Sequence, residues 1–362
     1  MAFEKASFRK SVAQLPTTLE PDTLYFVRAS TGFDLYLTNK AGVLVAYKMN
    51  SAAAGNDKTV QYNNSGYLGG ASNVLIDSDN LVIKDISAIP ASSNDGVKLF
   101  SLLENGKSKL SNVLPNGESF SFQRSFVDSK FISCQALGSA STVLVTSGTS
   151  SFSTSGTASA VAIAATKIGS IRKVKYSSGA AGSISGIYEP RLDFWRGNAA
   201  GLGGFHGKIR FNVDENPIVN NTRLFAGMAN TTAALSNVNP LTVTNSFGVC
   251  QAENLPNDNN LYFFIVGTST TVNIVDTGFT LDSAHYYELE IYAPPFSNMI
   301  YMQLMNKITG TVANVVFNSA NFPANQFPSD SAFLAMRLWR GNNGLLVNTN
   351  LTFSDFFMET GA

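Results

Sequence analysis

Two copies of one tetrapeptide hold the only tryptophans of this 362-residue chain, Trp195-Arg-Gly-Asn198 and Trp339-Arg-Gly-Asn342. Indole faces stack on apolar ring faces, and the guanidinium fork binds oxygen acceptors. This pairing fits a sugar-binding or inter-subunit surface, and neighbouring tyrosines extend it. The candidate binding residues are Trp195, Arg196, Trp339, Arg340, Tyr286 and Tyr292. The competing interpretation is structural, with both indoles closing opposite edges of one core.

Acid–base chemistry has one weak candidate. Glu288 and Glu290 lie two residues apart, on the same face of a predicted strand. Glycosidases use paired carboxylates, but carboxylates on an exposed strand are usually only solvated. Since no other pattern supports catalysis, we expect no enzymatic activity.

Metal, phosphate and redox chemistry are equally unsupported. His206 and His285 have no acidic or cysteine companions at ligand spacing. The Gly106-Lys-Ser108 stretch lacks the first glycine of a phosphate loop. Cys134 and Cys250 stand alone, so we expect two buried free thiols. We therefore predict no cofactor and no metal.

The stretch 205–213 alternates strictly between apolar and polar residues. A strand puts successive side chains on opposite faces, so this segment predicts a half-buried β-strand. Its polar face carries His206, Lys208 and Arg210, which we take as candidate subunit-interface residues.

Composition limits the class of protein further. Charged residues make up 14% of the chain and the formal net charge is zero, which argues against electrostatic binding to nucleic acid. No apolar run approaches the ~18 residues of a transmembrane helix, so we expect no membrane insertion. The N-terminus lacks the apolar segment of a secretory signal, which predicts synthesis in a cytoplasm.

The first part of the chain predicts small β units. Residues 1–50 hold three β-rich runs joined by turn residues, at 24–28, 33–37 and 43–47. Residues 51–135 hold short apolar triplets among turn residues and bury too little apolar surface to fold within one chain. We therefore predict either disorder or a shaft in which identical chains wind together.

A Ser/Thr/Ala-rich linker or arm is expected at 136–170, followed by an antiparallel β-sandwich of jelly-roll type at 171–362. In the run 286–292 we expect Tyr286, Glu288, Glu290 and Tyr292 on the outside. The predicted strands are 171–176, 190–196, 204–213, 222–229, 245–251, 261–267, 272–276, 286–292, 299–306, 312–317, 332–339 and 349–358.

Several motifs, taken in order, resemble the tail fibre proteins of tailed bacteriophages. The N-terminal module of that family is similar to 15–28 and 32–39, and its shaft repeats are similar to Val60-Gln-Tyr and the glycines up to Gly70. The joint that follows resembles 97–100 with 114–115. The family's C-terminal head resembles 201–206, 224–227, 245–249, 292–295 and 338–340.

This resemblance implies a non-enzymatic, homotrimeric fibre of the virion tail. Its N-terminal module would join a tail or baseplate protein, and its head would adhere to a host cell-surface polysaccharide. Two alternatives stay open. One is a structural virion connector or head fibre without receptor binding. The other is a polysaccharide-degrading tailspike, which would need a repeated β-helix and a carboxylate cleft that the sequence does not show.

Overall fold

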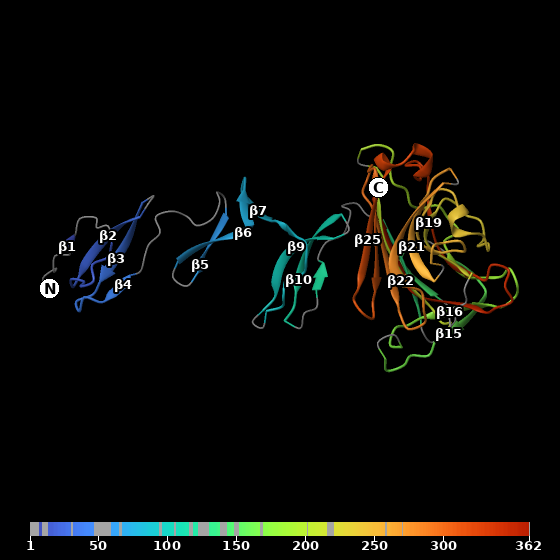
Figure 1. Cartoon of the computed structure of the whole chain (residues 1–362), viewed down its shortest axis with the longest axis horizontal. Coiled ribbons are helices and arrows are strands. Elements are labelled where there is room, and N and C mark those ends of the chain that lie inside the picture. The colour runs from blue at the N-terminus through green and yellow to red at the C-terminus, as the bar shows by residue number, and fades with distance from the viewer. Residues whose placement is uncertain are drawn as a thin grey trace. The chain divides into compact units, whose positions relative to one another are not determined.

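A computed structural model describes most of the chain and divides it into two compact units, residues 1–104 with 108–122, and residues 105–107 with 123–362. The described residues are 7–8, 14–29, 32–46, 59–64, 67–93, 96–104, 106–115, 119–121, 130–137, 143–147, 152–166, 169–200, 202–215, 221–257, 259–269 and 271–361. The predicted linker at 51–56 and the glycine at 201 lie outside them. Figure 1 shows the sheets of both units.

The first unit contains three small sheets. The first holds β1 (Ser7–Phe8), β2 (Thr23–Ala29), β3 (Gly32–Thr38) and β4 (Leu44–Ala46), in that order. The last three form an antiparallel meander. This agrees with the three β-rich runs expected within residues 1–50.

The second small sheet is a meander of β5 (Thr59–Asn64), β6 (Tyr67–Asp77) and β7 (Asn80–Ile83). Asp77 pairs with Asn80, and the two residues between them have φ of 47° and 71°. Such left-handed pairs make the tight hairpin turns that match strand twist. The sequence predicted only short apolar triplets among turn residues in this region, whereas the structure has the longer strands β5 and β6.

The third small sheet has the order β11-β10-β9-β8. Its strands are β8 (Asp85–Ile86), β9 (Lys98–Glu104), β10 (Lys107–Val113) and β11 (Ser119–Ser121). Its buried apolar cluster consists of only Phe100, Leu102 and Val113, with Ile86 packed against them. Several large apolar side chains of the first unit are exposed instead, namely Leu81, Ile89, Val97, Leu99 and Leu103.

The second unit is a two-sheet β-sandwich, as the sequence predicted. One sheet runs β13-β12-β27-β18-β23-β24-β25, with β16 also pairing with β27 and β15 with β16. Its strands are β12 (Lys130–Ala136), β13 (Val143–Ser147), β15 (Thr157–Ala160), β16 (Val174–Ser178), β18 (Phe205–Val213), β23 (Tyr287–Ala293), β24 (Met299–Asn306), β25 (Val312–Asn318) and β27 (Thr349–Thr360).

The facing sheet runs β14-β17-β26-β19-β20-β21-β22. Its strands are β14 (Ser153–Ser155), β17 (Ile184–Tyr188), β19 (Arg223–Ala229), β20 (Ser246–Gln251), β21 (Asn260–Val266), β22 (Val272–Thr280) and β26 (Ala335–Gly341). Three short 3-10 helices lie in its connections and those of its partner sheet, at Pro240–Thr242, Ser319–Asn321 and Ala324–Gln326.

The main core lies between the inner faces of the two sheets. In β18, Phe205, Ile209, Phe211 and Val213 are buried in this core, as the alternation from 205 to 213 predicted. Ile209 pairs with Leu289 of β23 on one side and Phe356 of β27 on the other. β18 is therefore a central strand whose dry face anchors the sandwich.

The sequence placed the start of the sandwich too late. β12 pairs with β27 along Lys130–Gln135, and β14 and β15 pair with β17 and β16. The predicted linker at 136–170 therefore contains the short edge strands β13, β14 and β15. β14 and β15 consist of Ser, Thr and Ala, which gave no apolar signal. The predicted strand at 190–196 is reduced to one bridge between Phe194 and Leu334, and β17 was missed.

Candidate functional site

A second apolar cluster covers the outer face of the seven-stranded sheet. Phe225, Cys250, Phe264 and Trp339 project from that face and are buried. The 230–245 connection between β19 and β20 packs over them with Leu235, Leu241 and Val243. This connection therefore forms a third layer on the sheet.

That layer encloses a pocket of about 370 Å³, which we call pocket A. Its lining residues are Phe225, Asn230, Thr231, Ala233, Ala234, Ser236, Val238, Thr242, Val243, Thr244, Arg337 and Trp339. The hydroxyl groups of Ser and Thr and the amide of Asn both donate and accept hydrogen bonds. Among these described lining residues there is no carboxylate and no histidine, and the polar ones other than Arg337 carry hydroxyl or amide groups.

The floor of pocket A is fixed by stacking and by one arginine. The Trp339 and Phe225 rings stack at 6.0 Å between centroids and 10° between planes. Arg337 donates from Nη1 to the Thr231 carbonyl oxygen at 2.8 Å and from Nη2 to the Ala233 carbonyl oxygen at 2.6 Å. Its guanidinium also lies over the Tyr188 ring. Arg337 thus holds the loop that forms the pocket wall.

A stacked aromatic pair, which we call the platform, lies beside the start of β26 and consists of the half-buried Trp195 and the exposed Phe333. The rings of Trp195 and Phe333 stack at 5.3 Å and 12°, and Phe333 is 46% exposed. Asn230, a lining residue of pocket A, donates from Nδ2 to the Phe333 carbonyl oxygen. The platform is therefore joined to the wall of pocket A.

Arg196, next to Trp195 in the chain, belongs to a second pocket of about 390 Å³, pocket B. The residues lining it are Arg196, Thr268, Asn298, Ser319, Phe322, Ala324, Phe327, Pro328, Ser329 and Asp330. Arg196 donates to the carbonyl oxygens of Pro328 at 2.8 Å and Ser297 at 2.5 Å. Burial lowers the pKa of Arg196 to about 10, although Asp330 opposes this shift. The arginine positions the pocket wall more than it offers a free charge.

The two Trp-Arg-Gly-Asn motifs lie in different surroundings in the structure. Trp195 contributes to the platform, and Trp339 to the floor of pocket A, where it is only 2% exposed. Arg340 is fully buried, with Nε 2.8 Å from Oε1 of Glu215 and Nη1 2.9 Å from Oε1 of Gln251. The expectation that Arg340 contacts a ligand is wrong, because this ion pair removes it from the surface.

The tyrosine candidates also differ from expectation. Tyr286 is 1% exposed and hydrogen-bonds Ser354 through its hydroxyl, so it is not the surface residue that was predicted. Tyr292 is half-buried and stacks on Tyr301 at 5.9 Å. Neither lines pocket A or pocket B.

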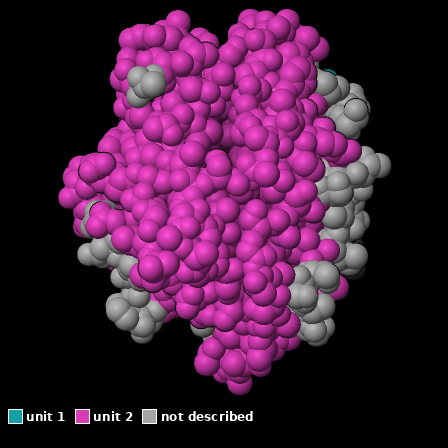
Figure 2. Space-filling view, turned by 90° about the vertical axis from the view of Figure 1, so that its right-hand side faces the viewer, with its two compact units in different colours: residues 1–104, 108–122 teal, residues 105–107, 123–362 magenta. Residues whose placement is uncertain are grey.

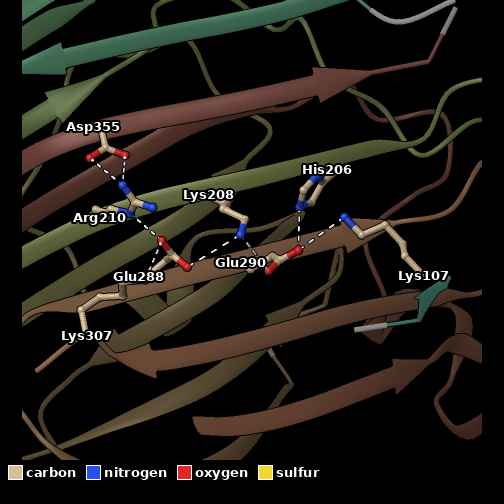
Figure 3. A network of polar contacts seen from close by, with 8 residues as sticks. All are labelled: Lys107, His206, Lys208, Arg210, Glu288, Glu290, Lys307 and Asp355. Atoms are coloured by element: carbon tan, nitrogen blue, oxygen red, sulfur yellow. Dashed lines mark hydrogen bonds and ion pairs between the residues drawn. The ribbon is translucent and has the colours of Figure 1, made fainter. Parts of the chain in front are cut away.

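The outer face of the nine-stranded sheet carries a charge ladder rather than a solvated polar surface (Figure 3). Its rungs are His206 to Glu290 at 2.6 Å, Lys208 to Glu290 at 3.3 Å, Arg210 to Glu288 at 2.5 Å and Arg210 to Asp355 at 3.4 Å. Lys107 and Lys307 add further contacts to Glu290 and Glu288. Glu288 and Glu290, expected outside, are 4% and 2% exposed.

The ladder explains the ionisation of its members. Burial alone would raise the pKa of Glu288, but Lys208, Arg210 and Lys307 outweigh it and hold the pKa below its ordinary value. For His206, burial dominates over the Glu290 hydrogen bond and lowers the pKa to about 4. Both glutamates are therefore paired with cations, and Lys208 contacts the two of them. In a glycosidase, one carboxyl group would instead act as the acid and the other as the nucleophile.

Sites for other chemistry are limited as well. No group of three or more potential metal ligands is found in the described part of the chain. Cys134 and Cys250 are both free and buried, as expected, and burial raises the pKa of each thiol. Within the described ranges, no helix is long and apolar enough to cross a membrane.

Asn230, Phe333 and the Thr/Ser wall of pocket A were not among the residues predicted from the sequence. One signal was present, because the 230–245 connection is rich in Asn, Thr and Ser and exceeds the ~12–15 residues beyond which loops are often functional. The stacking of Trp195 on Phe333 joins residues far apart in the chain, so no local pattern predicts it.

No protein-family model and no curated protein matches this chain. Solved lectin structures resemble it distantly. Winged bean acidic lectin complexed with methyl-alpha-D-galactose is 13% identical, with a TM-score of 0.41, over 65% of this chain and 99% of the lectin. Lectin I from Ulex europaeus, in complex with the methyl glycoside of alpha-L-fucose, is 10% identical with a TM-score of 0.42, over 65% and 99%. These values are too low to argue for a shared function.

Proposed function

We propose that the second unit binds a neutral carbohydrate chain of a bacterial surface at pocket A and leaves it chemically unchanged. The observation that carries this proposal is the composition of the pocket wall. It combines Ser, Thr and Asn side chains with apolar Val and Ala side chains, above the buried rings of Phe225 and Trp339. Sugar rings present hydroxyl groups at their edges and apolar C–H faces, so they match both kinds of wall.

The size of pocket A also suits a small ligand. Small-molecule sites usually enclose ~300–1,000 Å³, and pocket A has about 370 Å³. Its one charged residue, Arg337, already donates to two backbone carbonyl oxygens and lies over Tyr188. A neutral glycan therefore fits better than an anionic one.

We further propose that the chain is a homotrimeric receptor-binding fibre of a bacteriophage tail, with its N-terminal module on the virion. The ordered motifs of the sequence support this role. The first unit adds support, because Leu81 and Leu99 are each 61% exposed and Leu103 is 53% exposed. Copies of the same chain would cover these side chains and remove their apolar surface from water, which is favourable.

Trimerisation would also compensate for weak sugar binding. Linking several sites makes later contacts intramolecular, which raises overall avidity by ~10²–10⁴ when the geometry allows simultaneous binding. A fibre with one pocket A per chain would adhere firmly to a repetitive polysaccharide while each contact stays reversible.

The direct test is binding of the purified full chain to an array of bacterial capsular and lipopolysaccharide chains. We expect binding to at least one neutral polysaccharide, and loss of that binding in Ala234→Trp, which fills pocket A from an exposed lining position. The matched control is Ala181→Trp, at an exposed position that lines neither pocket.

The fibre role has its own readout. Purified chain should compete with virions for attachment to host cells, and Ala234→Trp should not. Binding to no polysaccharide would refute the glycan proposal. Equal binding by Ala234→Trp and wild type would remove pocket A as the site. Release of reducing ends from the bound polysaccharide would instead indicate a degrading tailspike.

A further inference from the structure

Resting on the proposed glycan binding, we infer that the ligand is an extended neutral oligosaccharide that runs from pocket A across the Trp195–Phe333 platform to pocket B. Pocket A alone would recognise one end of a glycan. The platform and pocket B would make the protein read several consecutive sugars, so that affinity depends on chain length.

The first link is between pocket A and the platform. Asn230 lines pocket A and donates from its side-chain amide to the backbone of Phe333. The same residue follows the last position of β19, and Ala229 pairs with Ala335 at the start of β26. The backbone of Phe333, and with it one end of the platform, therefore lies next to the wall of pocket A.

The second link runs to pocket B. The backbone amide of Asn230 donates to the Asn245 carbonyl oxygen at 3.1 Å. The Asn245 side-chain oxygen accepts from the Ser329 amide at 3.2 Å, and Ser329 lines pocket B. Asn245 has a φ of 46°, a left-handed conformation that Asn tolerates better than most residues. Asn245 thus connects Asn230, which lines pocket A, to Ser329, which lines pocket B.

The platform also reaches pocket B from its other ring. Trp195 precedes Arg196, whose guanidinium lies 4.6 Å from the Phe327 ring centroid in the pocket B wall. Pocket A, the stacked pair and pocket B are therefore connected at one end of the sandwich. Figure 2 shows that the surface of this unit is hollowed between two lobes at one edge.

The chemistry of the three parts is complementary. The aromatic floor of pocket A is almost inaccessible, so this pocket offers mainly hydrogen bonds. The platform adds an accessible aromatic ring, because Phe333 is 46% exposed. An apolar face of a sugar can pack against such a ring. Pocket B repeats the combination of polar and apolar walls through Asn298 and Ser319 with Phe322. Its Arg196 and Asp330 offset each other's charge, which again suits a neutral chain.

The test uses the polysaccharide that binds on the array, partially hydrolysed with acid and separated into fractions of one to about six sugars. Full-length protein is titrated with each fraction by calorimetry. For wild type, we expect Kd to fall at least about 10-fold from the shortest to the longest fraction. For Phe333→Ala, we expect the longest fraction to lose about 10-fold in affinity and the shortest to bind as in wild type.

Two variants control for indirect effects. Phe333→Tyr keeps the ring and should retain wild-type affinity for every fraction. Phe131→Ala removes a comparable exposed, stacked ring, 40% exposed and 6.5 Å from Phe357 on the other sheet, and should change nothing. Affinity that does not depend on length, or that Phe333→Ala leaves intact for long fractions, would overturn this inference alone. An array without any bound polysaccharide would instead refute the proposed function beneath it.

Discussion

The guanidinium of Arg340 forms a doubly bonded ion pair with the Glu215 carboxylate inside the second unit. Arg340 Nε lies 2.8 Å from Oε1 and 2.9 Å from Oε2, and Nη2 lies 2.5 Å from Oε2. Glu215 also accepts from the Asn350 backbone amide. Glu215, two residues after the end of β18, therefore bonds to β26 through Arg340 and to β27 through Asn350. These two strands belong to different sheets.

Breaking this pair should destabilise the protein strongly. Removing one partner of a buried ion pair leaves the other charge without compensation, which typically costs ~3–5 kcal/mol. We expect Arg340→Met to lower the free energy of unfolding by about that amount in urea denaturation. Lys175→Met serves as the control, because its pair with Asp214 is largely exposed and should contribute below ~1 kcal/mol. Equal midpoints for the two variants would contradict this.

Acid should weaken the fold through His206. Its folded pKa is about 4, against 6.5 ordinarily, so between these pH values the unfolded chain takes up a proton that the folded chain does not. Stability from this residue is therefore complete above about pH 6.5 and is lost as pH falls toward 4. The loss at the low end is roughly 3 kcal/mol. Denaturation at stepped pH measures it.

The variant His206→Gln should flatten this part of the pH profile, because Gln still hydrogen-bonds Glu290 but does not titrate. The matched control is Tyr292→Phe, which removes a hydroxyl group from the ring packed against His206 but removes no histidine. Since burial raises the pKa of Tyr292 above its ordinary value, this variant should leave the slope between pH 6.5 and 4 as in wild type. An unchanged slope in His206→Gln would show that His206 is not the source.

The proposed homotrimer is tested by the molar mass of the purified protein in solution. Light scattering should give three times the chain mass of 38.7 kDa at low protein concentration. Replacing Leu99 and Leu103 with Ser should reduce it, because both side chains are more than half exposed in a single chain. A monomeric wild type would refute the trimeric fibre.

The alternation of apolar and polar residues in the sequence was sufficient to predict the sandwich strands in which it is strong. The dry face of 205–213 and the runs at 299–306 and 312–317 were predicted nearly to the residue. The same pattern did not predict the edge strands β14 and β15, which contain mainly Ser, Thr and Ala. These strands form because the sheet offers pairing partners, which local sequence does not reveal.

The site was harder to predict than the fold. Polar alternation indicated that Glu288 and Glu290 face outward, but their burial depends on cations from β18 and elsewhere that satisfy them. Trp339 was among the predicted binding residues, and its place in the floor of pocket A depends on the loop folded over it. Arg340 shared its motif but was withdrawn from the surface by Glu215, a residue distant in sequence.

The most direct test of the central claim uses the two tryptophans as reporters. Trp195→Phe leaves Trp339 in the floor of pocket A as the single indole. This variant is titrated with the shortest fraction prepared from the polysaccharide that binds on the array. We expect a saturable change in tryptophan emission, with the same Kd as calorimetry gives. Calorimetric binding with no change in Trp339 emission would contradict pocket A as the sugar site.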